Sequence, residues 1–243
     1  MCKLPSANMP WPCKKNQEVK NKRVMKKELI LTKDGSHSLY VPQLNETYHS
    51  VHGSVAETLH VFIKNGLNYN TKVKLNILEI GFGTGLNTLL TLLHSDEKQI
   101  HYTGLEPYPI SEKIFSKLNF SELVKTDKET FLNLHLSEWE KDIKLSDIFT
   151  LHKSENKLQD FESKNKFDVI YFDAFAPEKQ EEMWSEDVFI KCYNLLNKDG
   201  YLVTYCAKGV VKRILRSVGF IVESLEGPPR KREMIRANKL PNN

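Results

Sequence analysis

The chain has 243 residues, of which 40% are hydrophobic and 27% are charged. Because a chain of this length packs around one core, the sequence predicts a single globular unit with small appendages. No segment approaches the roughly 18 consecutive apolar residues of a membrane span, and the N-terminus lacks an apolar signal run, which together predict a cytoplasmic protein without a membrane anchor. No cysteine spacing suggests a disulfide framework or a zinc site, so we expect no metal and free thiols at Cys2, Cys13, Cys192 and Cys206.

The positive charge of the chain is concentrated at its start. The net charge is +4, but residues 1–27 contain eight Lys or Arg against one Glu, a net of +7, and the remaining residues therefore carry −3. Residues 1–27 also contain three prolines and no hydrophobic periodicity, so burial cannot offset the entropy lost on ordering them. We expect them to form a disordered basic tail.

Residues 28–70 predict a small N-terminal extension packed on the core. Two β-prone runs flank the turn sequence KDGS at 33–36, which is typical of a hairpin. Apolar residues then recur at helical spacing in SVAETLHVFIKNGL, residues 54–67, and Gly66 is a helix stop.

From residue 71 to 243 the chain forms the predicted main core, in which apolar runs alternate with amphipathic segments. Expected strands are 75–80, 100–105, 148–151, 169–172 and 201–205, and expected helices include 88–94, 111–118 and 188–196. This alternation predicts an α/β fold with a mostly parallel sheet covered by helices on both faces.

The end of the chain departs from this alternation. An amphipathic helix at 209–220 is followed by strand-like segments at 221–227 and 232–237, separated by a turn. An antiparallel pair at the end of a parallel sheet distinguishes a class I methyltransferase from a dinucleotide-binding Rossmann sheet. By this analogy of fold we predict a Rossmann-like, class I S-adenosylmethionine-dependent methyltransferase with a terminal antiparallel hairpin and an N-terminal hairpin and helix extension.

The segment LNILEIGFGTGLNTLL places three glycines between a strand and a helix. Glycine lets the backbone turn tightly and approach a ligand closely, so a nucleotide-type cofactor is expected above this strand. The spacing E-x-G-x-G-x-G differs from the dinucleotide pattern, whose third glycine would fall at Leu86, and no lysine follows as in a triphosphate-binding loop. The candidate cofactor contacts here are Glu79, Gly81, Phe82, Gly83, Gly85 and Asn87.

Glu106 ends the second expected strand, about twenty residues beyond the glycine loop. An acid at this position can accept hydrogen bonds from both hydroxyls of an adenosine ribose. The combination of loop and acid therefore predicts an adenosine-type cofactor. The alternative is that the glycines only mark a turn and that Glu106 is a surface acid.

In FDVIYFDAFAPEKQEEMW, residues 167–184, an apolar strand runs directly into Asp173. At the carboxyl end of a parallel strand, Asp173 lies on the same sheet edge as the glycine loop. Pro177 prevents an immediate helix at Ala176, the residue before it, so residues 174–177 stay extended and Phe175 can project into the pocket. Phe175 and Pro177 are therefore candidate pocket residues. Lys179 and Trp184 are further candidate substrate contacts, although such residues are more often solvated or packed.

A carboxylate beside a methyl donor suits an amine acceptor. S-adenosylmethionine reacts by in-line displacement, and a free alkylamine is mostly protonated at neutral pH, so it has no lone pair to offer. Asp173 can accept the N–H hydrogen bonds, take up the departing proton and orient the nitrogen. The alternative is that Asp173 caps the next helical turn and Phe175 belongs to the core.

Several of these segments resemble the MnmD methyltransferases and the methyltransferase half of the bifunctional MnmC enzymes. The resemblance spans about residues 29–237, and its most specific parts are D-x-F-A-P-x-K-x-x-x-M-W at 173–184 and G-P-P-x-K-R-E-M at 227–234. It implies S-adenosyl-L-methionine as cofactor and tRNA as partner, with methylation of the exocyclic amine of 5-aminomethyl-uridine, usually 2-thiolated, at the wobble position.

Carried over by motif, the resemblance implies that the three glycines line the cofactor site, that Glu106 holds the ribose and that Asp173 positions the amine. The flavin-dependent oxidase domain of the bifunctional relatives is not expected in a chain of this length, so we expect action on the aminomethyl form alone, downstream of the enzymes that install it. One feature departs from many class I methyltransferases, since no clear acid ends the third strand; Glu155 and Asp160 are the candidates for adenine recognition.

A tRNA partner needs a basic surface, and residues 208–236 carry a net charge of +5. Phosphate contacts would supply much of the affinity and make it salt-dependent, although such a run is equally compatible with a solvated face. The candidate tRNA contacts are Lys208, Arg213, Arg230, Lys231 and Arg232.

Three other functions are alternatives to the hypothesis of a tRNA methyltransferase. The first is N-methylation of a small-molecule or protein amine by the same cofactor. The second is a nicotinamide-dependent oxidoreductase, although the loop spacing is wrong for it. The third is a non-catalytic RNA-binding protein, against which Gly81, Glu106 and Asp173 argue.

Overall fold

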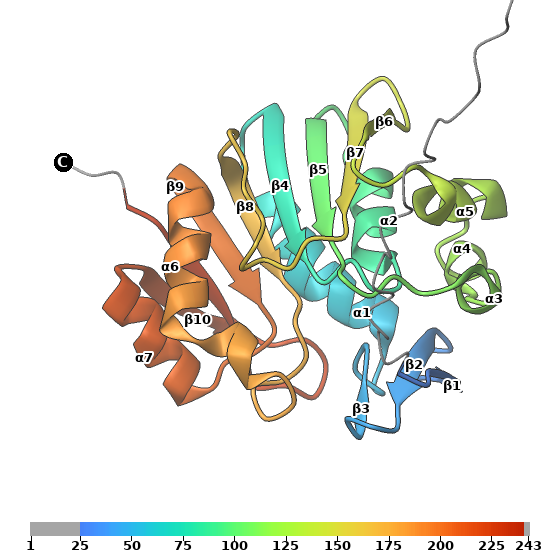
Figure 1. Cartoon of the computed structure of the whole chain (residues 1–243), viewed down its shortest axis with the longest axis horizontal. Helices are drawn as coiled ribbons and strands as arrows, with labels where there is room; N and C mark the ends of the chain where they lie inside the picture. Colours follow the sequence, from blue (N-terminus) through green and yellow to red (C-terminus); the bar gives the residue numbers. More distant parts are fainter. Residues whose placement is uncertain (1–24, 241–243) are drawn as a thin grey trace, which may run out of the picture.

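The computed structural model describes residues 25–240, which form a mixed eight-stranded sheet with helices on both faces and a separate three-stranded N-terminal sheet (Figure 1). The strand order of the large sheet is β10-β11-β9-β8-β4-β5-β7-β6. Its strands are β4 (Lys74–Ile80), β5 (Gln99–Leu105), β6 (Asp142–Lys144), β7 (Phe149–Ser154), β8 (Phe167–Phe172), β9 (Leu196–Thr204), β10 (Ile221–Glu226) and β11 (Glu233–Asn238). The pairs from β9 across to β7 are parallel.

Two antiparallel additions complete the sheet. At one edge β6 pairs antiparallel with β7. At the other, β11 lies between β9 and β10 and is antiparallel to both. This terminal hairpin confirms the expected class I methyltransferase fold.

The sheet is buried on both faces because the apolar side chains of each strand alternate between two cores. In β8, Val169 and Tyr171 belong to one core, and Ile170 and Phe172 belong to the other. All six residues of β8 are buried, as expected for a central parallel strand.

Helices cover the two faces separately (Figure 1). On one face lie α6 (Glu186–Leu195) and α7 (Gly209–Val218), which pack on each other. On the other face α2 (Leu86–Leu93) packs against α1 (Ser54–Thr58) and α5 (Lys128–Leu136). Two shorter helices, α3 (Glu112–Phe115) and α4 (Phe120–Leu123), pack on α5.

The N-terminal extension contains the expected hairpin, in which β1 (Glu28–Leu31) pairs antiparallel with β2 (His37–Val41). A two-residue strand, β3 (Glu46–Thr47), extends it. The expected helix at 54–67 is broken into α1, a π-helical segment at Leu59–Lys64 and a 3₁₀ turn at Leu67–Tyr69. Gly66 starts the last turn with a negative φ, so it is not a left-handed helix stop.

The five expected strands and the terminal helix and hairpin are confirmed, with shifted ends. Four elements were not predicted from the sequence: β3, β6, α4 and α5. Only Phe131 and Leu134 of α5 are buried, so its apolar periodicity is too weak to recognise. The expected tail at 1–27 lies outside the described residues except for 25–27, and the division at residues 28 and 71 stays a prediction.

Within residues 25–240 no helix combines the length and apolar character needed to cross a membrane. In the same part of the chain, no three or more His, Cys, Asp or Glu side chains are grouped as metal ligands. Cys192 and Cys206 are buried and unpaired.

Candidate active site

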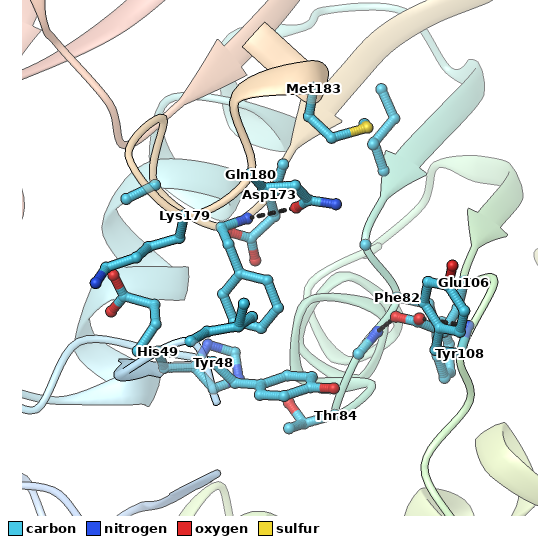
Figure 2. Close-up of a pocket in the computed structure, with 18 of the residues that line it drawn as sticks. Tyr48, His49, Phe82, Thr84, Glu106, Tyr108, Asp173, Lys179, Gln180 and Met183 are labelled. Atoms are coloured by element: carbon cyan, nitrogen blue, oxygen red, sulfur yellow. Dashed lines mark hydrogen bonds between the residues drawn. The ribbon is translucent and has the colours of Figure 1, made fainter. Parts of the chain in front are cut away.

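A cleft of about 2000 Å³ opens at the carboxyl ends of β4, β5 and β8, where ligands bind in open parallel sheets. Small-molecule sites usually measure roughly 300–1,000 Å³, so this cleft has room for a cofactor and part of a second substrate. In Figure 2, Glu106 and Tyr108 lie on one side of it, and Asp173, Lys179 and Gln180 lie on the other.

The glycine loop forms the floor between these two sides. Gly81 has φ 92° and Gly83 has φ 49°, in the left-handed region that favours glycine. A Cβ on Gly81 would lie 2.6 Å from the backbone oxygen of Asp173, and one on Gly83 would lie 3.1 Å from the Tyr48 ring. A side chain at Gly81 would therefore clash with the backbone, and one at Gly83 would press on the Tyr48 ring. Both glycines border the cleft.

Glu106 follows β5 and holds the loop in place. Its Oε2 accepts from the backbone N–H of Gly83 at 3.0 Å, and its Oε1 accepts from that of Tyr108 at 2.9 Å. The side chain is buried but borders the cleft, and burial raises its pKa. Each carboxylate oxygen has a second lone pair, so both remain able to accept from the two hydroxyls of a ribose.

Asp173 follows β8 directly beside the glycine loop, and its backbone N–H donates to Ile80 O at 3.0 Å. Its Oδ2 accepts from Asn87 Nδ2 at 2.8 Å. Removal from water raises the pKa of this carboxyl to about 7, and Glu57 adds to the rise, whereas Asn87 and Lys231 oppose it. A carboxyl with this pKa exchanges a proton readily near neutral pH.

An aromatic wall stands next to Asp173. Phe175 packs edge-on against Tyr48 with ring centroids 5.2 Å apart, and both side chains line the cleft. The Phe175 backbone is held on both sides, since its N–H donates to Gln180 Oε1 at 3.2 Å and its oxygen accepts from Trp184 Nε1 at 2.8 Å. The two rings are nearly perpendicular, at 85°, so a base could stack on the face of one ring and meet the edge of the other.

Four of the predicted site residues do not line the cleft. Glu79 is fully buried, with Oε2 accepting from Thr88 Oγ1 at 3.0 Å, and burial raises its pKa to about 8. Gly85 caps α2 against His135. Trp184 is 4% exposed and packs against Phe172. Pro177 does not border the cleft. The remaining predicted cofactor and substrate contacts border it: Gly81, Phe82, Gly83, Asn87, Glu106, Asp173, Phe175 and Lys179. Glu155 and Asp160, the candidates for adenine recognition, border it as well.

The predicted basic cluster is partly neutralised. Lys208 pairs with Glu178. Lys231 lines the cleft, where its ammonium pairs with Glu57 at 2.5 Å. Arg213, Arg230 and Arg232 are exposed and have no ion-pair partner within residues 25–240.

The N-terminal extension contributes cleft residues that the sequence analysis missed, among them Tyr48, His49 and Glu57. His49 Nε2 lies 2.7 Å from Thr84 Oγ1 of the glycine loop, and burial lowers the pKa of this imidazole to about 4. One signal was available, since Tyr48 and His49 begin YHSVHGSVAETLHVFI, residues 48–63, a segment that also resembles the MnmD methyltransferases. Neither residue has a spacing that indicates chemistry.

The fold and the glycine loop together define the molecule as a class I methyltransferase in architecture. A model of a family described as S-adenosyl-L-methionine-dependent methyltransferase matches residues 109–240, more than half of the chain. The chain therefore belongs to this family, and its cofactor is S-adenosyl-L-methionine.

Named relatives and a solved structure agree with this assignment. The chain is 34% identical over 214 residues to the tRNA 5-methylaminomethyl-2-thiouridine biosynthesis bifunctional protein MnmC of Leptospira interrogans, covering 79% of this chain and 32% of the relative. It is 30% identical over 233 residues to the protein of the same name from Cupriavidus metallidurans, covering 88% and 34%. The chain thus spans about a third of the length of these curated relatives.

The crystal structure of MNMC2 from Aquifex aeolicus shares the fold, with a TM-score of 0.71 at 24% identity over 91% of this chain and 73% of that one.

Proposed function

We propose that the protein transfers a methyl group from S-adenosyl-L-methionine to the exocyclic amine of 5-aminomethyl-uridine, with or without 2-thiolation, at the wobble position of tRNA. The product is the 5-methylaminomethyl form. Such a substrate would place the reaction in the cytoplasm. The relatives' names refer to this modified nucleoside, and the proposal concerns methyl transfer alone.

The observation that carries the proposal is the contact between Asp173 and the glycine loop. The ideal Cβ position of Gly81 lies 2.6 Å from the backbone oxygen of Asp173, and both residues line the cleft, so a cofactor held by the loop would lie close to Asp173. The loop backbone at Gly81 and Gly83 and the oxygens of Glu106 fit a ribose and a methionyl group. When bound, the cofactor supplies an electrophilic methyl group.

Asp173 prepares the acceptor. It takes a proton from the substrate ammonium, which leaves a neutral amine whose lone pair can form the new N–C bond while the S–C bond breaks. The product is a secondary ammonium ion, and the proton on Asp173 passes to solvent through the open cleft. Such proton transfer contributes about 10²- to 10⁴-fold, and alignment of the two reactants contributes more.

The aromatic wall supports a nucleobase as the carrier of the amine. Phe175 and Tyr48 present adjacent rings beside Asp173, and single-stranded bases commonly stack on aromatic side chains. Arg230 and Arg232 flank Lys231, whose side chain lines the cleft. They are therefore the proposed contacts to anticodon-loop phosphates. Arg213 on α7 and Lys208, which pairs with Glu178, are weaker candidates.

Methylation of a free small-molecule or protein amine remains the alternative, because the same carboxylate would serve it. The nicotinamide alternative loses its basis, since the chain belongs to an S-adenosyl-L-methionine-dependent family.

The deciding experiment is mass spectrometry of nucleosides from tRNA bearing 5-aminomethyl-uridine, after incubation with the protein and methyl-labelled cofactor. Label is expected in the wobble nucleoside as its methylaminomethyl form. Equal turnover of the free nucleoside, or label in a protein and none in tRNA, would favour the alternative.

A further inference from the structure

Asn87 was expected among the cofactor contacts, but both the nitrogen and the oxygen of its side-chain amide form hydrogen bonds with other side chains of the protein. Its Nδ2 donates to Asp173 Oδ2 at 2.8 Å, and its Oδ1 accepts from Thr58 Oγ1 at 2.9 Å. Asn87 is 2% exposed and lies in the first turn of α2, just after the glycine loop. One N–H of the amide remains, and the Asn87 amide also acts on the buried carboxyl of Glu79, whose pKa it lowers.

Thr58 decides which way the amide points. Because its hydroxyl donates to the amide oxygen, the amide nitrogen is turned toward Asp173. The reversed amide would place its oxygen against Asp173 Oδ2, and two acceptors repel unless the carboxyl is protonated. The chain of bonds from Thr58 to Asp173 therefore favours the ionised carboxylate, the form able to take a proton.

The other ionisable groups that act on Asp173 come from four different elements. Glu57 on α1 raises its pKa, and Lys231 in the β10–β11 turn lowers it. Glu79 on β4 and Tyr205 after β9 also interact with its charge. None of these four donates a hydrogen bond to the carboxylate; within residues 25–240, Asn87 is the one side chain that does.

We propose that Asn87, oriented by Thr58, is a positioning residue for Asp173, holding Oδ2 so that Oδ1 faces the acceptor amine. This inference rests on the proposed function of Asp173. Thr58 makes α1 of the N-terminal extension part of the active site, although it touches no reactant.

The test compares Asn87→Ala and Thr58→Val with the control Thr91→Val. Thr91 lies on the same helix and donates to the backbone oxygen of Asn87 at 2.7 Å, so the control loses an equivalent hydroxyl without disturbing the amide. Cofactor affinity is measured by calorimetry, and kcat and KM for the tRNA are measured across the neutral and alkaline pH range.

Loss of a hydrogen bond to a charged group shifts the pKa upward by about one unit. Asn87→Ala should therefore move the acidic limb of kcat about one unit higher and cost about tenfold in kcat below it, with recovery at alkaline pH. Thr58→Val should show a smaller shift in the same direction, and Thr58→Ser should restore the parent profile. Cofactor affinity and KM should stay within about twofold, and the control should match the parent.

A second readout is the pH titration of the Asp173 carboxyl carbon followed by NMR. The Asp173 signal is identified as the one that is absent from the spectrum of Asp173→Asn. The inference is wrong if both variants titrate as the parent does, or if weaker cofactor binding accounts for the lost activity. If Asn87→Ala does not fold, Thr58→Val alone decides the test. Normal turnover of Asp173→Asn would overturn the proposed function instead, while the titration would still decide whether Asn87 acts on Asp173.

Discussion

Lys231 Nζ lies 2.5 Å from Glu57 Oε1, although the two residues are 174 positions apart in the sequence. The pair joins the turn of the terminal hairpin to α1 of the N-terminal extension beside the candidate base. The same ammonium lies 4.1 Å from the centre of the Tyr205 ring. Glu57 is 10% exposed and Lys231 33% exposed, so this ion pair is screened less than one on the surface.

Removing Lys231 should therefore affect both stability and catalysis. Lys231→Met leaves Glu57 without its cation, which should cost about 1–3 kcal/mol in the free energy of unfolding. Because Lys231 lowers the pKa of Asp173, its loss should also reduce turnover on the acidic side of the pH profile. Denaturant unfolding and the pH dependence of kcat measure the two effects. Glu57→Gln in the same chain should recover part of the stability, whereas Lys208→Met, which breaks an exposed pair, should cost less than about 1 kcal/mol.

Asp173→Ala should leave cofactor affinity nearly unchanged and lower kcat by about 10²- to 10⁴-fold. In the parent, kcat should rise with pH through about 7, because the pKa of Asp173 is raised to about 7 and only the ionised form accepts a proton. Steady-state rates with labelled cofactor, together with calorimetric binding, separate the two effects. A variant that turns over at the parent rate would remove Asp173 from the mechanism.

Gly81→Ala should destabilise the protein and weaken cofactor binding, because the added Cβ meets the Asp173 backbone oxygen at 2.6 Å and φ is 92°. Backbone strain of this kind costs roughly 1–3 kcal/mol, before the clash is added. Gly35→Ala is the matched control, since Gly35 also has a positive φ but nothing within 4 Å of its Cβ position. Thermal unfolding and cofactor titration should show a clearly larger loss for Gly81→Ala, and equal losses would show that the close approach has no consequence.

Charge reversal of Arg230 and Arg232 should weaken tRNA binding and flatten its dependence on salt. Each lost phosphate contact should reduce the magnitude of the log–log salt slope by about one. Lys141→Glu serves as control, because Lys141 adjoins β6, at the sheet edge opposite the terminal hairpin. Binding isotherms at several salt concentrations measure the slope. An unchanged slope in the double variant would place the tRNA on another surface.

Glu79→Gln should stabilise the protein increasingly as the pH rises. The pKa of Glu79 is raised from 4.5 to about 8 by burial, so between these values the folded state holds a proton that the unfolded state has lost. The parent's free energy of unfolding therefore falls with rising pH, and this group contributes up to about 1.4 kcal/mol per pH unit to the fall. Glutamine does not titrate, so the variant does not lose this stability. Unfolding free energies measured across that window should diverge in favour of the variant, and cofactor affinity should change little. A large loss of cofactor affinity would show that Glu79 does contribute to the cofactor site.

Local patterns were enough to predict most of the sheet and the central pair of the site. The apolar run ending at Asp173 and the glycines before α2 are contiguous segments, and a parallel sheet brings the carboxyl ends of its strands to one edge. Segments with weak periodicity were not predictable. In α5 two buried residues in nine left no apolar stripe, and β3 is only two residues long.

Side-chain roles were harder to predict than strands. Trp184 belongs to a specific motif, yet its indole is buried against Phe172 and donates to the backbone oxygen of Phe175. Lys231 belongs to a basic run, yet it turns inward to meet Glu57. A charge pattern cannot distinguish these cases, because it does not record what a side chain meets across the fold.

By itself, the sequence determined the sheet, the glycine loop, and the presence of an acid at the tips of β5 and β8, since each depends on residues adjacent in the chain. Only the tertiary structure decided that Tyr48, His49 and Glu57 reach the cleft, and that Asn87 faces Asp173 across 86 positions. The physical reason is that burial and hydrogen bonding depend on distance in space, and segments far apart in sequence come together only in the folded chain.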